Sequence, residues 1–114
     1  MKISIPETVQ AGQRRGRVVK ADLLPEFGKL VVTLELETKR RIALWYAVAS
    51  DGSFATDYSA RAYERLCVAF GGGYEETDEL LGKEAEFELR VMQGRSQIFY
   101  EVWPVTEEAV DGVR

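Results

Sequence analysis

The sequence contains no histidine and a single cysteine, Cys67. Without histidine the chain lacks the commonest general base and the commonest metal ligand of proteins. Ser–His and Cys–His nucleophile pairs are therefore excluded, and one cysteine argues against a structural zinc site. One cysteine also excludes an internal disulfide and fits a reducing cytosol. We therefore expect a cytoplasmic protein that is not an enzyme and that holds neither a metal nor another cofactor.

Long hydrophobic runs are also missing. No apolar run approaches the roughly 18 residues of a membrane-spanning helix. The first residues, MKISIPETVQAG, lack the apolar core of a secretory signal, so neither membrane insertion nor secretion is expected. With 114 residues, 46% of them hydrophobic, the chain has the size and apolar content of one globular domain with one core.

Charge is distributed unevenly along the chain, although the net charge is only −4. Residues 14–41 contain eight basic and four acidic residues, whereas residues 42–114 contain six basic and fourteen acidic ones. Such asymmetry is typical of a surface that faces a polyanion, set against an acidic remainder. A mixed, solvated surface is the alternative of equal weight.

Five segments have the composition of β-strands: residues 14–24, 29–38, 41–49, 83–91 and 97–105. Alternation is cleanest in 29–38, where apolar and polar residues predict one buried and one solvent-facing side. Gly16 predicts a bulge or bend in the first strand. The residues Gln93-Gly94-Arg95-Ser96 predict a tight hairpin with Gly94 at a positive φ.

One helix is expected between the third and fourth strands, with Asp57 or Ser59 as its N-cap. Its apolar stripe consists of Ala62, Leu66, Ala69 and Phe70, and Arg61, Glu64 and Arg65 lie on the opposite face. The glycines 71–73 end it, because glycine readily takes the left-handed conformation.

The order β-β-β-α-β-β predicts a mainly-β fold, a five-stranded OB-fold barrel over residues 14–105 with a helix between strands 3 and 4. An N-terminal arm (1–13) precedes the barrel, and an acidic C-terminal tail (106–114) follows it.

Basic and aromatic residues form the most informative constellation. Trp45 is expected to point out of the barrel, where a base can stack on it while guanidinium groups contact phosphates. The candidate nucleic-acid-binding residues are Arg14, Arg15, Arg17, Arg40, Arg41 and Trp45. Tyr46, Phe99 and Trp103 are alternative candidates for a further stacking ring. Together these residues predict a module that binds single-stranded DNA with weak sequence preference. The alternative is that Trp45 packs under the N-terminal arm or a loop.

The chain resembles a family of bacteriophage and prophage OB-fold proteins, many of them associated with single-stranded DNA binding in replication or recombination. The resemblance covers residues 14–105. It is carried by Ala62-Tyr63-Glu64-Arg65-Leu66, by the glycine stop, and by Glu79-Leu80-Leu81-Gly82-Lys83 leading into strand 84–91. It implies an OB-fold and a role in phage replication or recombination.

A protein-interaction or assembly module is the alternative function. In that case Phe99 and Trp103, exposed on the fifth strand, bury against a second copy of the chain or against a replication or recombination protein. No spacing of acidic residues resembles a calcium loop, so no metal site is expected.

Overall fold

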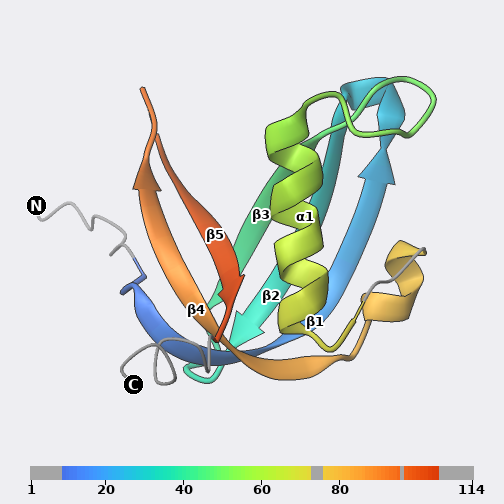
Figure 1. Cartoon of the computed structure of the whole chain (residues 1–114). Helices are drawn as coiled ribbons and strands as arrows, with labels where there is room; N and C mark the ends of the chain where they lie inside the picture. The colour runs from blue at the N-terminus through green and yellow to red at the C-terminus, as the bar shows by residue number, and fades with distance from the viewer. Residues whose placement is uncertain (1–8, 73–75, 96, 106–114) are drawn as a thin grey trace, which may run out of the picture.

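The computed structural model describes residues 9–72, 76–95 and 97–105, which form a curved five-stranded sheet with one α-helix against it (Figure 1). The strands are β1 (Gly12–Leu24), β2 (Lys29–Leu36), β3 (Arg41–Ala47), β4 (Glu84–Gln93) and β5 (Ile98–Pro104). The helix α1 (Asp57–Ala69) follows β3, and a short 3₁₀ helix (Thr77–Leu80) precedes β4. The mainly-β fold and the position of the helix, both predicted from the sequence, are confirmed.

The strands run antiparallel in the order β3-β2-β1-β4-β5. The long strand β1 bends between the two halves of the sheet, pairing with β2 along one part and with β4 along the other. The edge strands β3 and β5 approach each other, with Cα atoms within 8 Å, but no ladder joins them in the described part of the chain. The sheet is therefore open at this seam.

The β2–β3 hairpin contributes much of the core and follows the predicted alternation. Every second residue of each strand is buried, namely Leu30, Val32, Leu34, Leu36, Ile42, Leu44 and Tyr46. The intervening residues are partly or fully exposed. Because a strand alternates its side chains between two faces, the apolar pattern alone determines which face packs inward.

Two glycines serve purposes other than those predicted. The irregularity in β1 lies between Val18 and Lys20 rather than at Gly16. At Gly16, a Cβ atom would lie 3.2 Å from the Phe87 ring, so glycine allows close packing there. Gly94 does not take a positive φ; a Cβ atom there would lie 2.8 Å from the Gln97 carbonyl oxygen.

The helix α1 lies within the bend of the sheet, in front of β2 and β3 in Figure 1, and contacts β3, β4 and β5. Its N-cap is Thr56, because the Thr56 hydroxyl accepts a hydrogen bond from the Ser59 N–H. The predicted caps, Asp57 and Ser59, both lie within the helix instead. Leu66 and Phe70 reach the core as predicted. Gly71 takes a positive φ just after the helix and ends it.

The expected arm and tail fall largely outside the described residues, which exclude 1–8 and 106–114. Of the arm, Gly12 and Gln13 belong to β1, and Val9 is buried in the core cluster. The Val9 N–H donates a hydrogen bond to the Tyr100 hydroxyl at 3.4 Å, which places the start of the described chain beside β5.

Candidate nucleic-acid interface

A groove of about 570 Å³ lies along the open seam between β3 and β5. Its lining residues are Val9, Arg40, Arg41, Ile42, Ala43, Trp45, Gln97, Ile98, Phe99 and Tyr100. We call this surface the β3–β5 groove. It brings three predicted nucleic-acid-binding residues, Arg40, Arg41 and Trp45, together with Phe99, which was predicted for a partner interface. None of the residues described along the groove is acidic.

Trp45 is exposed, with 62% of its surface accessible, as the alternation of β3 predicts. The Lys29 Nζ lies 4.3 Å from the centroid of the Trp45 ring, a cation–π contact from the neighbouring strand. The register pairs Lys29 with Ala47 and Val31 with Trp45, so β2 holds the cation beside the ring. No described contact places Trp45 under a loop.

A second pocket of about 400 Å³ lies on the other side of Trp45 and includes Phe27 and Lys29. Phe27 belongs to the 3₁₀ turn Pro25–Phe27 between β1 and β2 and is 71% exposed. Sequence reasoning treated this segment only as a turn. An aromatic residue at the tip of a proline–glycine turn, with no apolar periodicity to bury it, was the available signal.

The other predicted arginines do not line the groove, and they contact carboxylates. Arg14 lines a neighbouring pocket of about 760 Å³, which shares Val9 and Arg40 with the groove. The Arg14 guanidinium binds Glu37 in a bidentate manner, with nitrogen–oxygen distances of 2.8 and 3.0 Å. This hydrogen bonding raises the pKa of Arg14 and lowers the pKa of Glu37. Arg15 lies 3.3 Å from Glu84 and 3.9 Å from Glu86, both on β4. Sequence reasoning missed these acidic partners, which are distant in the chain.

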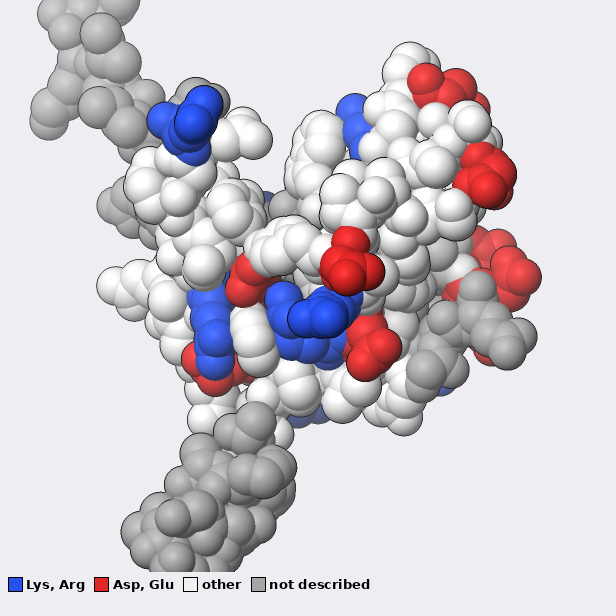
Figure 2. Space-filling model, turned by 45° about the horizontal axis from the view of Figure 1, so that its top comes forward, with Lys and Arg blue, Asp and Glu red and all other residues white. Residues whose placement is uncertain are grey.

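Glu35 sits between Arg17 on β1 and Arg41 on β3, at 3.2 and 3.5 Å. Basic and acidic side chains also lie next to each other on the face shown in Figure 2. Carboxylates therefore lie beside most of the arginines of the positive segment, residues 14–41. Only Arg40 and Arg41 among the predicted arginines line the β3–β5 groove.

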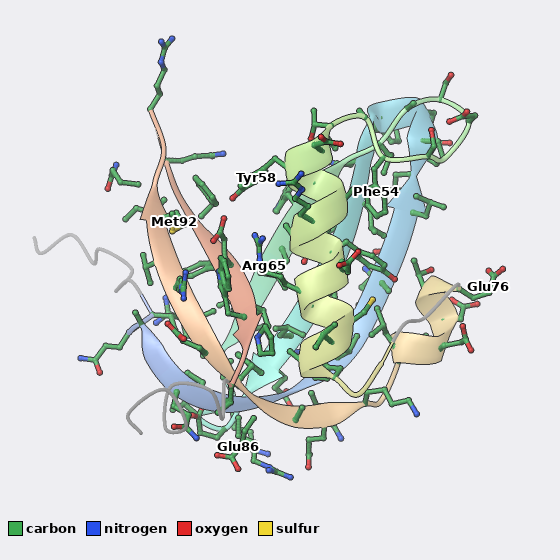
Figure 3. All side chains as sticks on the ribbon, in the orientation of Figure 1. Phe54, Tyr58, Arg65, Glu76, Glu86 and Met92 are labelled. Atoms are coloured by element: carbon green, nitrogen blue, oxygen red, sulfur yellow. The ribbon has the colours of Figure 1, made fainter. Side chains whose placement is uncertain are left out.

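A polar cluster joins α1 to β5 on the opposite side of β5 from the core. Glu101 is only 8% exposed, and its carboxylate accepts hydrogen bonds from the Tyr58 hydroxyl and from the Trp103 indole N–H, the latter at 2.9 Å. Arg65 lies 3.9 Å from the same carboxylate. Figure 3 shows Tyr58 and Arg65 on the side of α1 that faces β5. Of the two residues predicted to be exposed on β5, Phe99 is exposed and Trp103 is only partly so.

Trp103 belongs to this cluster rather than to an exposed patch with Phe99. The Arg65 and Arg90 guanidinium carbons lie 4.0 and 3.8 Å from the centroid of the Trp103 ring. Trp103 is therefore partly buried, whereas Phe99 remains 37% exposed. Arg65, predicted to face solvent, instead packs between α1 and β5, with its side chain 23% exposed.

Partial burial of Tyr58, followed by its hydrogen bond to Glu101, raises the pKa of Tyr58 from 10.0 to about 12. The unfolded chain therefore ionises first, and the stability from this contact is present below pH 10 and lost as the pH rises to about 12. We expect the free energy of unfolding in urea, measured from about pH 8 to about pH 11, to fall less steeply in Tyr58→Phe than in the wild type. Burial also raises the pKa of Tyr46 and Tyr63, so the variant keeps part of the slope. Equal slopes would contradict the prediction.

Among the described residues, no group of three or more histidine, cysteine or acidic side chains is arranged to hold a metal ion. Within the same part of the chain, no helix has the length and apolar character needed to cross a membrane. The two pockets beside Trp45 combine basic residues with aromatic rings. The pocket that Arg14 and Arg40 line has no aromatic residue in its described lining. A scan against protein-family models finds no match to this chain, and no curated protein sequence matches it either.

Proposed function

We propose that the protein is a non-enzymatic module that binds single-stranded DNA weakly, with little sequence preference, in the β3–β5 groove. The observation that carries this proposal is the meeting of Arg40, Arg41, Trp45 and Phe99 in one groove whose described lining is free of acidic residues. Single-strand binders combine a cationic track with aromatic rings on which successive bases stack. Both components are present here at the same seam.

The fold supports the proposal. Joining the free edges of β3 and β5 would close the order β3-β2-β1-β4-β5 into a five-stranded barrel, with α1 between strands 3 and 4, as in an OB-fold. OB-folds bind oligonucleotides on the face of strands 2 and 3 and with adjoining loops. We therefore propose an OB-fold, and the resemblance to phage proteins suggests replication or recombination as the setting.

The chemistry of the groove predicts modest affinity. Trp45 and Phe99 offer ring faces within the groove, and Phe27 offers a third on the far side of Trp45. A phosphate approaching Arg41 competes with Glu35, which lies 3.5 Å away. The net charge of −4 further opposes a polyanion. Because only Arg40 and Arg41 line the groove as cations in the described part of the chain, few counterions are released on binding, and the affinity should fall only moderately with salt.

Replacing Trp45 by alanine is expected to weaken binding of a labelled oligo-dT about tenfold, because loss of one stacking platform removes roughly 1–3 kcal/mol. Fluorescence anisotropy at low and moderate salt measures the affinity without relying on tryptophan emission. For the charges, Arg41→Gln in the groove is matched by Arg15→Gln outside it. Arg41→Gln should reduce the affinity and the salt dependence, and Arg15→Gln should change neither. Failure of the wild type to bind at low salt would exclude the proposed function.

Assembly is the second candidate function, favoured by the exposed side chains of Trp45, Ile98 and Phe99. They lie beside the outer edges of β3 and β5, which no other described strand pairs with. Exposed strand edges pair readily with other chains. Sedimentation distinguishes the two candidates, because a concentration-dependent dimer without any response to oligo-dT favours assembly. In that case Phe99→Ser should restore the monomer, whereas Trp103, held by Arg65 and Arg90, should matter less.

A further inference from the structure

The outer edge of β3 faces the β3–β5 groove, and no described strand pairs with it there. In an antiparallel pair, alternate residues direct both N–H and C=O toward the partner strand, and the residues between them direct both groups away. The Val48 N–H donates to the Gly28 carbonyl, and the Leu36 N–H donates to the Arg40 carbonyl. The backbone N–H and C=O groups of the even-numbered residues of β3 therefore point toward β2. The odd-numbered residues must face the opposite edge.

The hydrogen bonds of Ala47 show independently that the backbone groups of the odd-numbered residues point away from β2. The Ala47 N–H donates to the Ser59 hydroxyl at 2.8 Å, and the Ala47 C=O accepts from the Ala55 N–H at 2.9 Å, so both groups point away from β2. Because backbone groups alternate in direction along a strand, the N–H and C=O groups of Trp45, Ala43 and Arg41 also point away from β2 and toward the groove. No ladder satisfies them among the described residues.

The edge of β5 lies opposite, and alternate residues of β5 likewise direct their backbone N–H and C=O groups toward the groove. Gly94 donates to the Gln97 carbonyl, so Gln97 and Phe99 face β4, and the backbone groups of Ile98 and Tyr100 face the groove. Ala43 lies between Arg41 and Trp45 on β3, and all three line the groove. Ala43 is exposed, and its methyl group is the smallest of their side chains, so it obstructs the approach of a ligand to this edge least.

We propose that the free edge of β3 at Ala43 hydrogen-bonds the Watson–Crick edge of an unstacked base, an inference that rests on the proposed binding of single-stranded DNA. Every base carries a donor and an acceptor side by side on that edge, and Ala43 offers one N–H and one C=O in the same direction. Trp45, two residues along on the same face of β3, provides the stacking surface. The site therefore selects single strands, whose Watson–Crick edges are unoccupied, without strong preference among bases.

The direct test uses the wild-type protein and two labelled ligands, oligo-dT and the same oligomer built from N3-methylthymine. The methyl group removes the ring N–H donor and obstructs the Watson–Crick edge, but leaves the phosphates and the ring face in place. We expect the methylated oligomer to bind about fivefold to tenfold more weakly, as for one or two lost hydrogen bonds, and a duplex not to compete. Equal binding of both oligomers overturns the inference and leaves the proposed function intact. Binding of neither oligomer removes the proposed function itself.

Variants at Ala43 test the protein side. Ala43→Pro removes an N–H that takes no part in the β2–β3 ladder, a position where edge strands tolerate proline. It should weaken oligo-dT binding about fivefold and leave binding of the methylated oligomer unchanged. Ala43→Ser keeps the backbone donor and should behave like the wild type. An equal loss for both oligomers in Ala43→Pro overturns the inference. If that variant does not fold, the two-ligand comparison with the wild type still decides.

Discussion

Replacing Phe87 by alanine is expected to lower the free energy of unfolding by about 3–5 kcal/mol, the range for removing a buried aromatic ring. Phe87 is completely inaccessible and is the largest side chain buried to that extent. Its ring centroid lies 5.7 Å from that of Phe70 at the end of α1, and the same ring packs against Gly16 of β1. One side chain of β4 thus holds the helix and the central strand together.

Urea unfolding followed by far-ultraviolet circular dichroism measures this loss. Phe27→Ala is the matched control, because it removes the same ring from a site that is 71% exposed and should change stability by less than about 1 kcal/mol. Phe87→Leu retains much of the volume and should be destabilised less than Phe87→Ala. A similar loss in Phe27→Ala and Phe87→Ala would contradict the assignment of Phe87 as the centre of the core.

The sequence predicted the β2–β3 hairpin well because that part of the sheet is packed on one face only. There a period of two in hydrophobicity is enough to identify the buried residues, from Leu30 to Tyr46. Gly16 shows the limit of local reasoning. A glycine in a strand can signal a bulge or a close approach, and only the position of Phe87 across the β1–β4 pairing shows which applies.

Charge was harder to predict than hydrophobicity, because ion pairs form across strands. Summing residues 14–41 gives a positive segment, but Glu84 and Glu86 come from β4, far along the chain, and lie beside Arg15. The groove also depends on a non-local feature, the seam between β3 and β5. Phe99 was predicted mainly for a partner interface and only as an alternative stacking ring beside Trp45, and the topology brings both residues to one site.

Replacing Glu101 by leucine is expected to lower the free energy of unfolding by about 2–3 kcal/mol. Removing one member of a buried ion pair leaves the partner charge buried without a counter-charge, which typically costs about 3–5 kcal/mol. Arg65 keeps some contact with water, its side chain being 23% exposed, so we expect a loss below the range for fully buried pairs. Tyr58 and Trp103 also lose their acceptor, and the Trp103 indole N–H is left without one in a partly buried site.

A double-mutant cycle separates the charge from the packing. If the loss comes mainly from leaving the Arg65 charge without a partner, the double variant Arg65→Met with Glu101→Leu should lose less unfolding free energy than the two single variants lose in sum. Glu86→Gln removes an exposed carboxylate that lies 3.9 Å from Arg15, and should change stability by less than about 0.5 kcal/mol. Additive losses in the cycle would mean that Glu101 acts through its hydrogen bonds to Tyr58 and Trp103 alone. Phe99 and Glu101 both belong to β5, and the contacts of Glu101 with Tyr58 and Arg65 link this strand to α1. If these contacts also fix the wall of the β3–β5 groove, Glu101→Leu should lower the affinity for oligo-dT.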